Sequence, residues 1–446
     1  MIAEQVAPAT RRFKPGLTRE RAKSELRLKQ GIWLYFLLLL FEGALRKWVL
    51  PGLATPLLIV RDPLTLWILF GAAKLGILPT NNYYINGMTI TGIVGIFTAL
   101  FLGHGSLVVA IFGARILLLH FPLIFVIGKV FNQEDVKKIG KAVLWISLPM
   151  LLLIAVQFYS PQSAWVNRGV GGDVKGSGFS GALGYFRSSG TFSFTNGVTF
   201  FFSLLACFVF YFWINPAGVN RVLLIAATAA LAASIPLSIS RGLFFQIGVS
   251  LIFLIIAIVR EPKKLGRLVL AIVGGGVLII LLTQFPFFQT ATKAFLARFD
   301  SANKYEGGVK GTLGTRYLGG LLAPFISNSN LPFFGYGLGI GTNAGSALLT
   351  GKRSFLISEE EWGRLIGELG VLMGFIVIYL RVKLVIQFVS VSYKRLVSGD
   401  LLPWMLLSFA FLTVINAQWA QPTALGFSTL IAGLLVASFR VNKGSS

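Results

Sequence analysis

Residues 222–259 read VLLIAATAALAASIPLSISRGLFFQIGVSLIFLIIAIV, a stretch whose only charged side chain belongs to Arg241. A run of about 20 apolar residues is long enough to cross the hydrocarbon core of a bilayer as a helix. The stretch therefore predicts two membrane-spanning helices, at 222–239 and 242–259, joined by Ser238-Ile-Ser-Arg241-Gly242. Because this turn is so short, we expect Arg241 at the membrane boundary.

The rest of the chain has the same apolar character. Its 446 residues are 55% hydrophobic and include 39 Phe, and the mean hydropathy is +0.77. A soluble core could not bury this much apolar surface. We therefore expect an all-α, polytopic membrane protein with about twelve transmembrane helices. The expected spans are 31–50, 53–72, 87–103, 106–128, 141–160, 196–213, 222–239, 242–259, 267–285, 362–380, 401–417 and 423–439.

The distribution of basic residues indicates how the chain is oriented. Residues 1–30 are expected to form a basic cytoplasmic arm, followed by a single transmembrane domain at 31–446. With both termini cytoplasmic, the short loops rich in Lys and Arg fall on the inside, as the positive-inside rule requires. Arg46 and Lys47 lie near the outer end of the first span, against this rule, and we expect them to face an aqueous cavity.

The charge and the composition exclude several kinds of site. The formal charge is +24, but basic residues that flank membrane spans indicate topology, so no nucleic-acid partner is expected. The single cysteine, Cys207, lies in an apolar run, which excludes disulfides and cysteine metal sites. The chain has no HExxH motif and no Cys/His cluster. Neither a metal nor another cofactor is therefore expected.

Two long outer loops, 161–195 and 286–361, carry basic residues that topology does not explain, because long loops cross the membrane regardless of charge. Functional residues concentrate in loops, so we expect the function to reside there. The second loop should begin with an amphipathic helix. Its apolar face would comprise Phe288, Ala291, Phe295 and Phe299. The basic residues are Arg168, Lys175 and Arg187 in the first loop and Lys293, Arg298, Arg316, Lys352 and Arg353 in the second.

Arg241 and the second loop offer two places where an anion could bind. A guanidinium at the membrane boundary can hold phosphate oxygens bidentately, although an interfacial arginine can equally contact lipid phosphate. Farther along, Gly314-Thr-Arg316 precedes Pro332-Phe-Phe-Gly-Tyr-Gly-Leu-Gly. The glycines of this run would let the backbone approach a ligand closely, or they form a flexible turn.

Acidic residues gather where the second loop returns to the membrane, at Ser358-Glu359-Glu360-Glu361. Helix capping explains one or two of these carboxylates but not all three. Glu359 could act as a general base toward a sugar hydroxyl. Charges inside the earlier spans should either pair, Glu42 with Arg61 or Arg115, or line a substrate cavity.

Together these features resemble the superfamily of bacterial O-antigen ligases and O-antigen or exopolysaccharide polymerases, which are multi-spanning glycosyltransferases. The matching features are the layout of about twelve spans, the long loop between the ninth and tenth spans, Ser-Arg-Gly at 240–242, and Thr-Arg at 315–316 before the glycine run. The resemblance covers chiefly residues 190–380. It implies a GT-C-like membrane fold with a large periplasmic loop between helices 9 and 10.

The resemblance also implies roles for individual residues. Arg241 and Arg316 would bind the pyrophosphate of an undecaprenyl-linked glycan. Glu359 would be catalytic, because it stands where ligases typically have a histidine before a pair like Glu368-Leu-Gly370. The further candidates for binding pyrophosphate or glycan are Arg187 and Glu360.

The activity implied is metal-independent, inverting transfer of a lipid-linked glycan to an acceptor hydroxyl at the outer face of a bacterial inner membrane. The missing histidine favours a polysaccharide polymerase over the near alternative, an O-antigen-type ligase that joins glycan to a lipid or protein acceptor. The expected partners are the lipid-pyrophosphate-linked donor, a glycan or lipid acceptor, membrane lipids and other polysaccharide-assembly proteins. A transporter or flippase of lipid-linked or anionic glycan is the alternative from another class, and it predicts broken helices and charges near the midplane.

Overall fold

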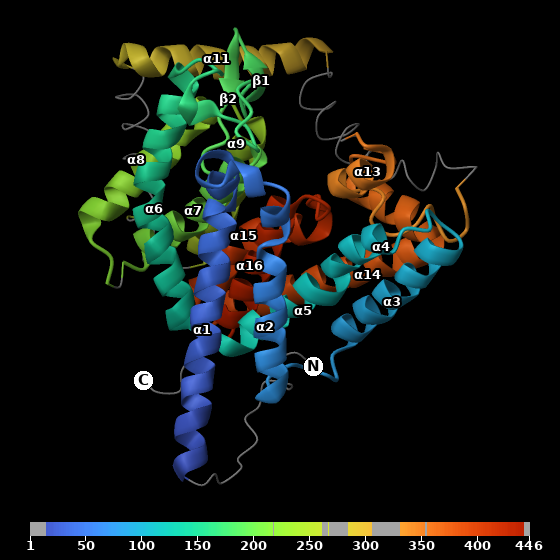
Figure 1. Ribbon diagram of the computed structural model, residues 1–446. Helices are drawn as coiled ribbons and strands as arrows, with labels where there is room; N and C mark the ends of the chain where they lie inside the picture. The colour runs from blue at the N-terminus through green and yellow to red at the C-terminus, as the bar shows by residue number, and fades with distance from the viewer. Residues whose placement is uncertain are drawn as a thin grey trace.

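The computed structural model describes residues 15–216, 218–260, 266, 284–305, 331–352 and 355–440. This part of the chain is a helical, multi-pass membrane protein (Figure 1). It contains nine helices long and apolar enough to cross a membrane, together with two shorter apolar helices. The expected span at 267–285 lies almost wholly outside the described residues, so the count of about twelve helices and the GT-C-like arrangement stay predictions.

The first half of the chain forms helices that run back and forth through the bundle. Residues 15–30 of the predicted basic arm are the first part of α1, which continues without a break into the first span. The bounds are α1 Pro15–Ala44, π-helical η2 Leu45–Val49, the short 3-10 helices η3 Pro51–Leu53 and η4 Pro56–Ile59, α2 Arg61–Lys74, α3 Tyr83–Phe101, α4 Leu107–Arg115, π-helical η5 Ile116–His120, α5 Phe121–Val130 and α6 Gln133–Tyr159.

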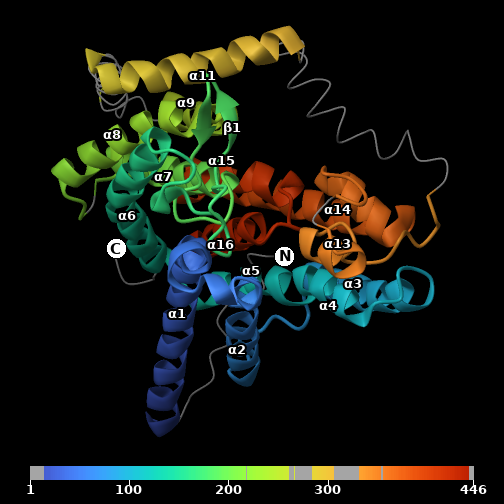
Figure 2. The same ribbon diagram turned by 45° about the horizontal axis from the view of Figure 1, so that its top comes forward.

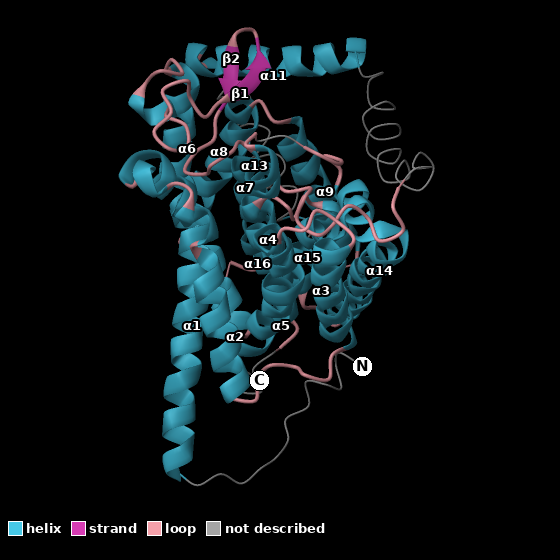
Figure 3. Cartoon of the chain, turned by 45° about the vertical axis from the view of Figure 1, so that its right-hand side comes forward, coloured by secondary structure: helices cyan, strands magenta, loops and turns pink. Residues whose placement is uncertain are grey.

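The second half adds the only strands among the described residues, a two-stranded antiparallel hairpin beside α11 (Figure 3). In the hairpin Phe179 pairs with Arg187 and Ala182 with Tyr185. The bounds are 3-10 helix η6 Trp165–Asn167, β1 Phe179–Ala182, β2 Tyr185–Arg187, α7 Asn196–Ile214, α8 Arg221–Ser238, α9 Arg241–Val259, α11 Pro286–Tyr305, α13 Asn343–Thr350, α14 Glu361–Val397, α15 Leu401–Asn416 and α16 Pro422–Ser438.

Glu42, Arg61, Asp62 and Arg115 are paired, which is the first of the two alternatives that the sequence left open. Arg61 Nε lies 2.9 Å from Glu42 Oε2, and Arg115 Nη1 lies 2.9 Å from Asp62 Oδ2. Arg61 also donates a 2.6 Å hydrogen bond to the carbonyl oxygen of Pro422 in α16. Buried charges are stable only when such partners compensate for the loss of water. The Arg61 contacts therefore tie α1, α2 and α16 together.

Arg46 and Lys47 do not face an aqueous cavity, and that expectation was wrong. Both are buried in η2, with exposed fractions of 6% and 0%. Lys47 Nζ donates to Ser189 Oγ at 3.0 Å and to the Gly190 carbonyl at 2.7 Å, and Arg46 Nη1 donates to Ser193 Oγ at 2.9 Å. Loop 161–195 thus folds over the end of α1 and supplies the polar partners that these two charges need.

The ends of the helices form two faces. On one face, where α1 begins, Lys29 pairs with Asp135 at the start of α6, and Gln133 Nε2 donates to Asp400 Oδ2 at 2.7 Å. We call it the amino-terminal face. The opposite face carries the hairpin and α11, which lies across the tops of α8 and α9 (Figures 1 and 2), and we call it the α11 face.

Candidate functional site

A tight turn places Arg241 at the first residue of α9. Ile239 adopts a left-handed conformation with φ of 47°, which ends α8 and reverses the chain. Ser240 then caps α9, because its Oγ accepts a 3.2 Å hydrogen bond from the backbone N–H of Leu243. Ser240 Oγ also lies 2.9 Å from Thr199 Oγ1 of α7. Arg241 therefore stands at the end of a candidate membrane span on the α11 face, as its sequence position predicts.

Three arginines from different elements come together on this face, and we call them the arginine cluster: Arg187 in β2, Arg241 in α9 and Arg298 in α11. Burial, followed by the positive charges of Arg298 and Arg241, lowers the pKa of Arg187 to about 10. Arg187 Nε is buried and has no hydrogen-bonding partner among the described residues. An anion bound between these guanidinium groups would offset the repulsion of like charges.

Packing of aromatic side chains fixes α11, and with it Arg298, above α9. The ring of Phe244 lies 6.0 Å from that of Phe295 and 5.7 Å from that of Phe299, measured between centroids. Ala291 is fully buried on the same helix. The apolar face expected for an amphipathic helix is therefore confirmed. Arg298 Nη1 also donates a 3.3 Å hydrogen bond to the carbonyl oxygen of Gly181 in β1, which joins the helix to the hairpin.

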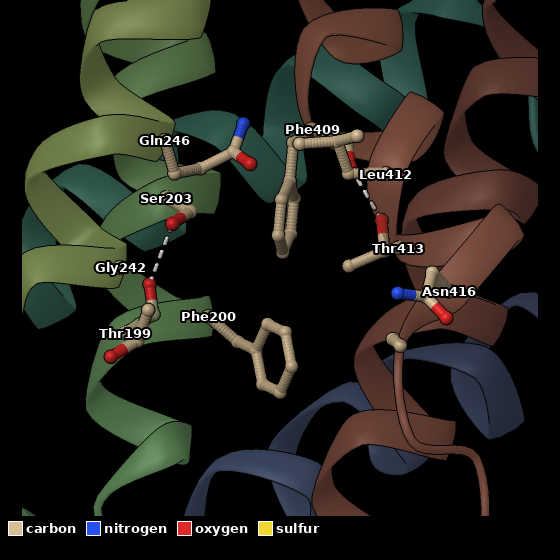
Figure 4. A pocket seen from close by; sticks show the side chains of 10 residues that line it. Thr199, Phe200, Ser203, Gly242, Gln246, Phe409, Leu412, Thr413 and Asn416 are labelled. Carbon is tan, nitrogen blue, oxygen red and sulfur yellow. Dashed lines mark hydrogen bonds between the residues drawn. The ribbon is translucent and has the colours of Figure 1, made fainter. Parts of the chain in front are cut away.

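A pocket of about 210 Å³ lies beside Arg241, between α7, α9 and α15 (Figure 4). Gly242, the residue after Arg241, belongs to its lining. The rings of Phe200 and Phe409 lie between the wall made by α7 and α9 and the wall made by α15. The polar lining residues are Thr199, Ser203, Gln246, Thr413 and Asn416. The pocket therefore combines aromatic surface with neutral hydrogen-bonding groups.

The predicted base, Glu359, lies on the α15 side of this pocket. Its backbone carbonyl accepts a hydrogen bond from Gln418 Nε2, and Gln418 directly follows the pocket-lining residues Asn416 and Ala417. The Glu359 side chain is exposed. Glu360, the half-buried residue before α14, donates its backbone N–H to Ser358 Oγ at 3.1 Å. The pocket thus adjoins the chain next to Arg241 on one side and the segment that bears Glu359 on the other.

The third carboxylate of the acidic run has a structural role. Glu361 is buried, with Oε1 2.9 Å from Arg364 Nη2 and 2.6 Å from Arg381 Nη1. Arg364 Nη1 continues the network to Glu368 Oε2 at 2.5 Å. The spacing of Glu361, Arg364 and Glu368 along one helix indicates such pairs, but Arg381 lies too far along the chain for sequence spacing to reveal it. Both carboxylates are fully buried and held by arginines, so an acceptor hydroxyl cannot reach them.

The glycine run packs against a break in α14. Gly370 has φ of 76° and ψ of 172°, so the helix is interrupted there. The backbone N–H of Tyr336 donates to the Gly367 carbonyl at 2.8 Å, and that of Gly341 donates to Glu368 Oε1 at 2.9 Å. The glycines therefore let the backbone approach α14 closely, and hydrogen bonds to α14 hold the run in place.

The structure brings together some of the predicted site residues. Arg187 and Arg241 lie in one cluster, and the sequence interpretation did not assign Arg298 to the site. Glu359 is connected to the α15 side of the pocket through its backbone bond to Gln418, Glu360 is the next residue in the chain, and Arg316 falls outside the described residues. Within the described ranges, no three His, Cys, Asp or Glu side chains gather in a way that could hold a metal ion.

No protein family, curated protein or solved structure matches this chain. The function therefore has to be inferred from the geometry of the α11 face. Its informative features are the arginine cluster, the adjoining pocket and the exposed Glu359.

Proposed function

We propose that the protein is a membrane glycosyltransferase that polymerises an envelope or exported polysaccharide. It would transfer a glycan from an undecaprenyl-pyrophosphate carrier to a hydroxyl of an acceptor sugar. The observation that carries the proposal is the arginine cluster beside a pocket at the end of membrane-spanning helices. A lipid pyrophosphate brings its anionic group to this depth of the bilayer, where Arg187, Arg241 and Arg298 could hold it.

The proposed reaction needs a base and a stabilised leaving group. Glu359 accepts the proton of the acceptor hydroxyl while the oxygen of that hydroxyl attacks the anomeric carbon. The bond from the anomeric carbon to the pyrophosphate breaks, and the configuration of the carbon is inverted. The lipid pyrophosphate leaves with its negative charge, which the arginines stabilise. The exposed side chain of Glu359 suits this role better than the carboxylates of Glu361 and Glu368, which are bound to arginines.

The proposal also assigns the two faces of the molecule. Loops on the amino-terminal face are short and rich in Lys and Arg, which supports a cytoplasmic location for that face and for both termini. The α11 face, with loops 161–195 and 286–361, would then lie in the periplasm of a bacterium whose inner membrane holds the protein. An O-antigen-type ligase remains the near alternative, because the same cluster would hold the same donor.

One observation favours the alternative of a transporter for lipid-linked or anionic glycan. Helix α14 is broken at Gly370, and broken helices carry the binding sites of many transporters. Here, however, the backbone of residues 335–341 occupies the break and takes up its carbonyl groups. The arginine cluster also lies on the α11 face, at the end of the α9 span, and not near the midplane. We therefore favour the enzyme.

Substitutions of the predicted site residues test the proposal. Arg241→Ala, Arg316→Ala and Glu359→Gln should each lower glycan extension about 100-fold or more, as loss of a transition-state contact does, while the protein stays folded in the membrane. The matched control is Arg221→Ala at the start of α8 on the opposite face, which should retain activity. Full activity in all three variants would overturn the site assignment.

A further inference from the structure

The pocket beside Arg241 has the chemistry of a sugar-binding site. Its polar lining residues are neutral, and they carry hydroxyl or amide groups. Two phenylalanine rings, Phe200 and Phe409, lie among them with centroids 6.1 Å apart. Neutral hydroxyl and amide groups match the hydroxyls of a sugar, and aromatic faces can pack against the C–H face of a sugar ring. An isoprenoid tail could not form hydrogen bonds with the amides.

Some of this hydrogen-bonding capacity is not used within the protein. Asn416 Oδ1 is buried and has no hydrogen-bonding partner among the described residues. Figure 4 shows the nitrogen of the same amide directed into the space between the two walls. Gln246 uses Nε2 to donate a 2.9 Å hydrogen bond to the Ser408 carbonyl, which fixes the orientation of its amide. The side chain of Asn416 therefore presents an N–H donor that can bind an oxygen atom of a ligand in the pocket.

The size and the position of the pocket fit one sugar ring. Its volume of about 210 Å³ exceeds the roughly 150 Å³ of an apolar protein cavity that admits a benzene ring. It borders Arg241 through Gly242 on one side and, through Gln418, the backbone of Glu359 on the other. A sugar in this place would stand between the residues that hold its pyrophosphate and the residue that activates the acceptor.

We infer that this pocket binds the pyrophosphate-linked sugar of the donor, and that Asn416 and Gln246 recognise its hydroxyl or amide substituents. The inference rests on the proposed function and adds to it the residues that distinguish one donor sugar from another. The carbohydrate part of the donor, and not the lipid, is therefore the occupant of the pocket.

Equilibrium binding to the full-length protein in lipid nanodiscs tests the inference. Two ligands are compared: the host's own undecaprenyl-pyrophosphate-linked glycan and bare undecaprenyl pyrophosphate. The wild type should bind the glycan-bearing lipid about tenfold more tightly or better, as one or two additional hydrogen bonds imply. Asn416→Leu and Gln246→Leu should each remove most of this difference and leave the affinity for the bare lipid unchanged.

The control is Ser250→Ala, which removes a hydroxyl from α9 outside the pocket and should keep the difference. The sugar site is refuted if both pocket variants retain the difference, or if they weaken binding of the two lipids equally. A wild-type protein that binds neither lipid would instead contradict the proposed function. Using two variants on separate helices guards against misfolding of either one.

Discussion

Replacement of Arg187 by methionine should stabilise the protein in the absence of ligand. Arg187 is half-buried near Arg298 and Arg241, and its pKa is about 10. Because this folded-state pKa is depressed, Arg187 is charged at every pH below about 10 and its charge lowers the stability of the folded state throughout that range. The difference from the ordinary pKa of arginine corresponds to about 3 kcal/mol. Solvent screening reduces this value, so we expect the free energy of unfolding to rise by about 1 kcal/mol.

The same substitution should weaken the response to ligand. A ligand at 100 times its Kd stabilises the folded state by about 2.7 kcal/mol, and undecaprenyl pyrophosphate should do so for the wild type. The Arg187→Met variant should gain clearly less, because one of the three cations is missing. Thermal unfolding in nanodiscs, with and without this lipid, measures both effects. Lys175→Met, which removes an exposed charge from the same loop, is the matched control and should change neither.

Two results would refute this reasoning. A ligand-free Arg187→Met protein that unfolds at a lower temperature than the wild type would mean that the arginine is satisfied where it lies. Equal stabilisation of both proteins by the lipid would mean that the arginine cluster does not bind pyrophosphate.

Two further predictions concern residues that hold α14 in place. Glu361→Gln should lower the free energy of unfolding by about 3–5 kcal/mol, because two buried arginines lose their shared carboxylate. The matched control is Glu359→Gln, at an exposed position, which should leave the unfolding temperature unchanged. Gly370→Ala should be far more destabilising than Gly399→Ala, although both glycines have a positive φ. A Cβ at position 370 would lie 1.9 Å from the backbone oxygen of Phe333, whereas a Cβ at position 399 would meet no atom. Unfolding midpoints of purified variants check both, and equal effects at the two glycines would contradict the second.

Much of the fold could be predicted because hydropathy and helix length are properties of contiguous sequence. The stretch 222–259 forms two helices joined at Arg241, and the expected amphipathic helix is the first part of the second loop. The fate of Arg46 and Lys47 could not be predicted in this way. Arg46 has a local partner in Glu42, 3.5 Å away, as well as Ser193 on loop 161–195. The hydrogen-bonding partners of Lys47 lie on that loop, far from it in the chain, and no local pattern reveals that the loop folds over it.

The site was predictable to a smaller extent. Arg187 and Arg241 stand out as cations that topology does not require, but their meeting with Arg298 depends on how the hairpin and α11 pack. The acidic run was conspicuous in the sequence, yet burial separates the structural Glu361 from the exposed Glu359. The pocket could not be predicted from the sequence, because its polar residues are of common types and are spread over three helices.

The most direct test of the account is to reconstitute the purified protein in lipid with the host's undecaprenyl-pyrophosphate-linked glycan, with a metal chelator present, and to separate the products by gel. We predict a ladder of longer lipid-linked glycans that Arg241→Ala abolishes. If the wild type, shown to be folded and to bind the donor, produced no ladder, the central claim of a metal-independent polymerase would be contradicted. Addition of a lipid or protein acceptor would then reveal a ligase if glycan became joined to it.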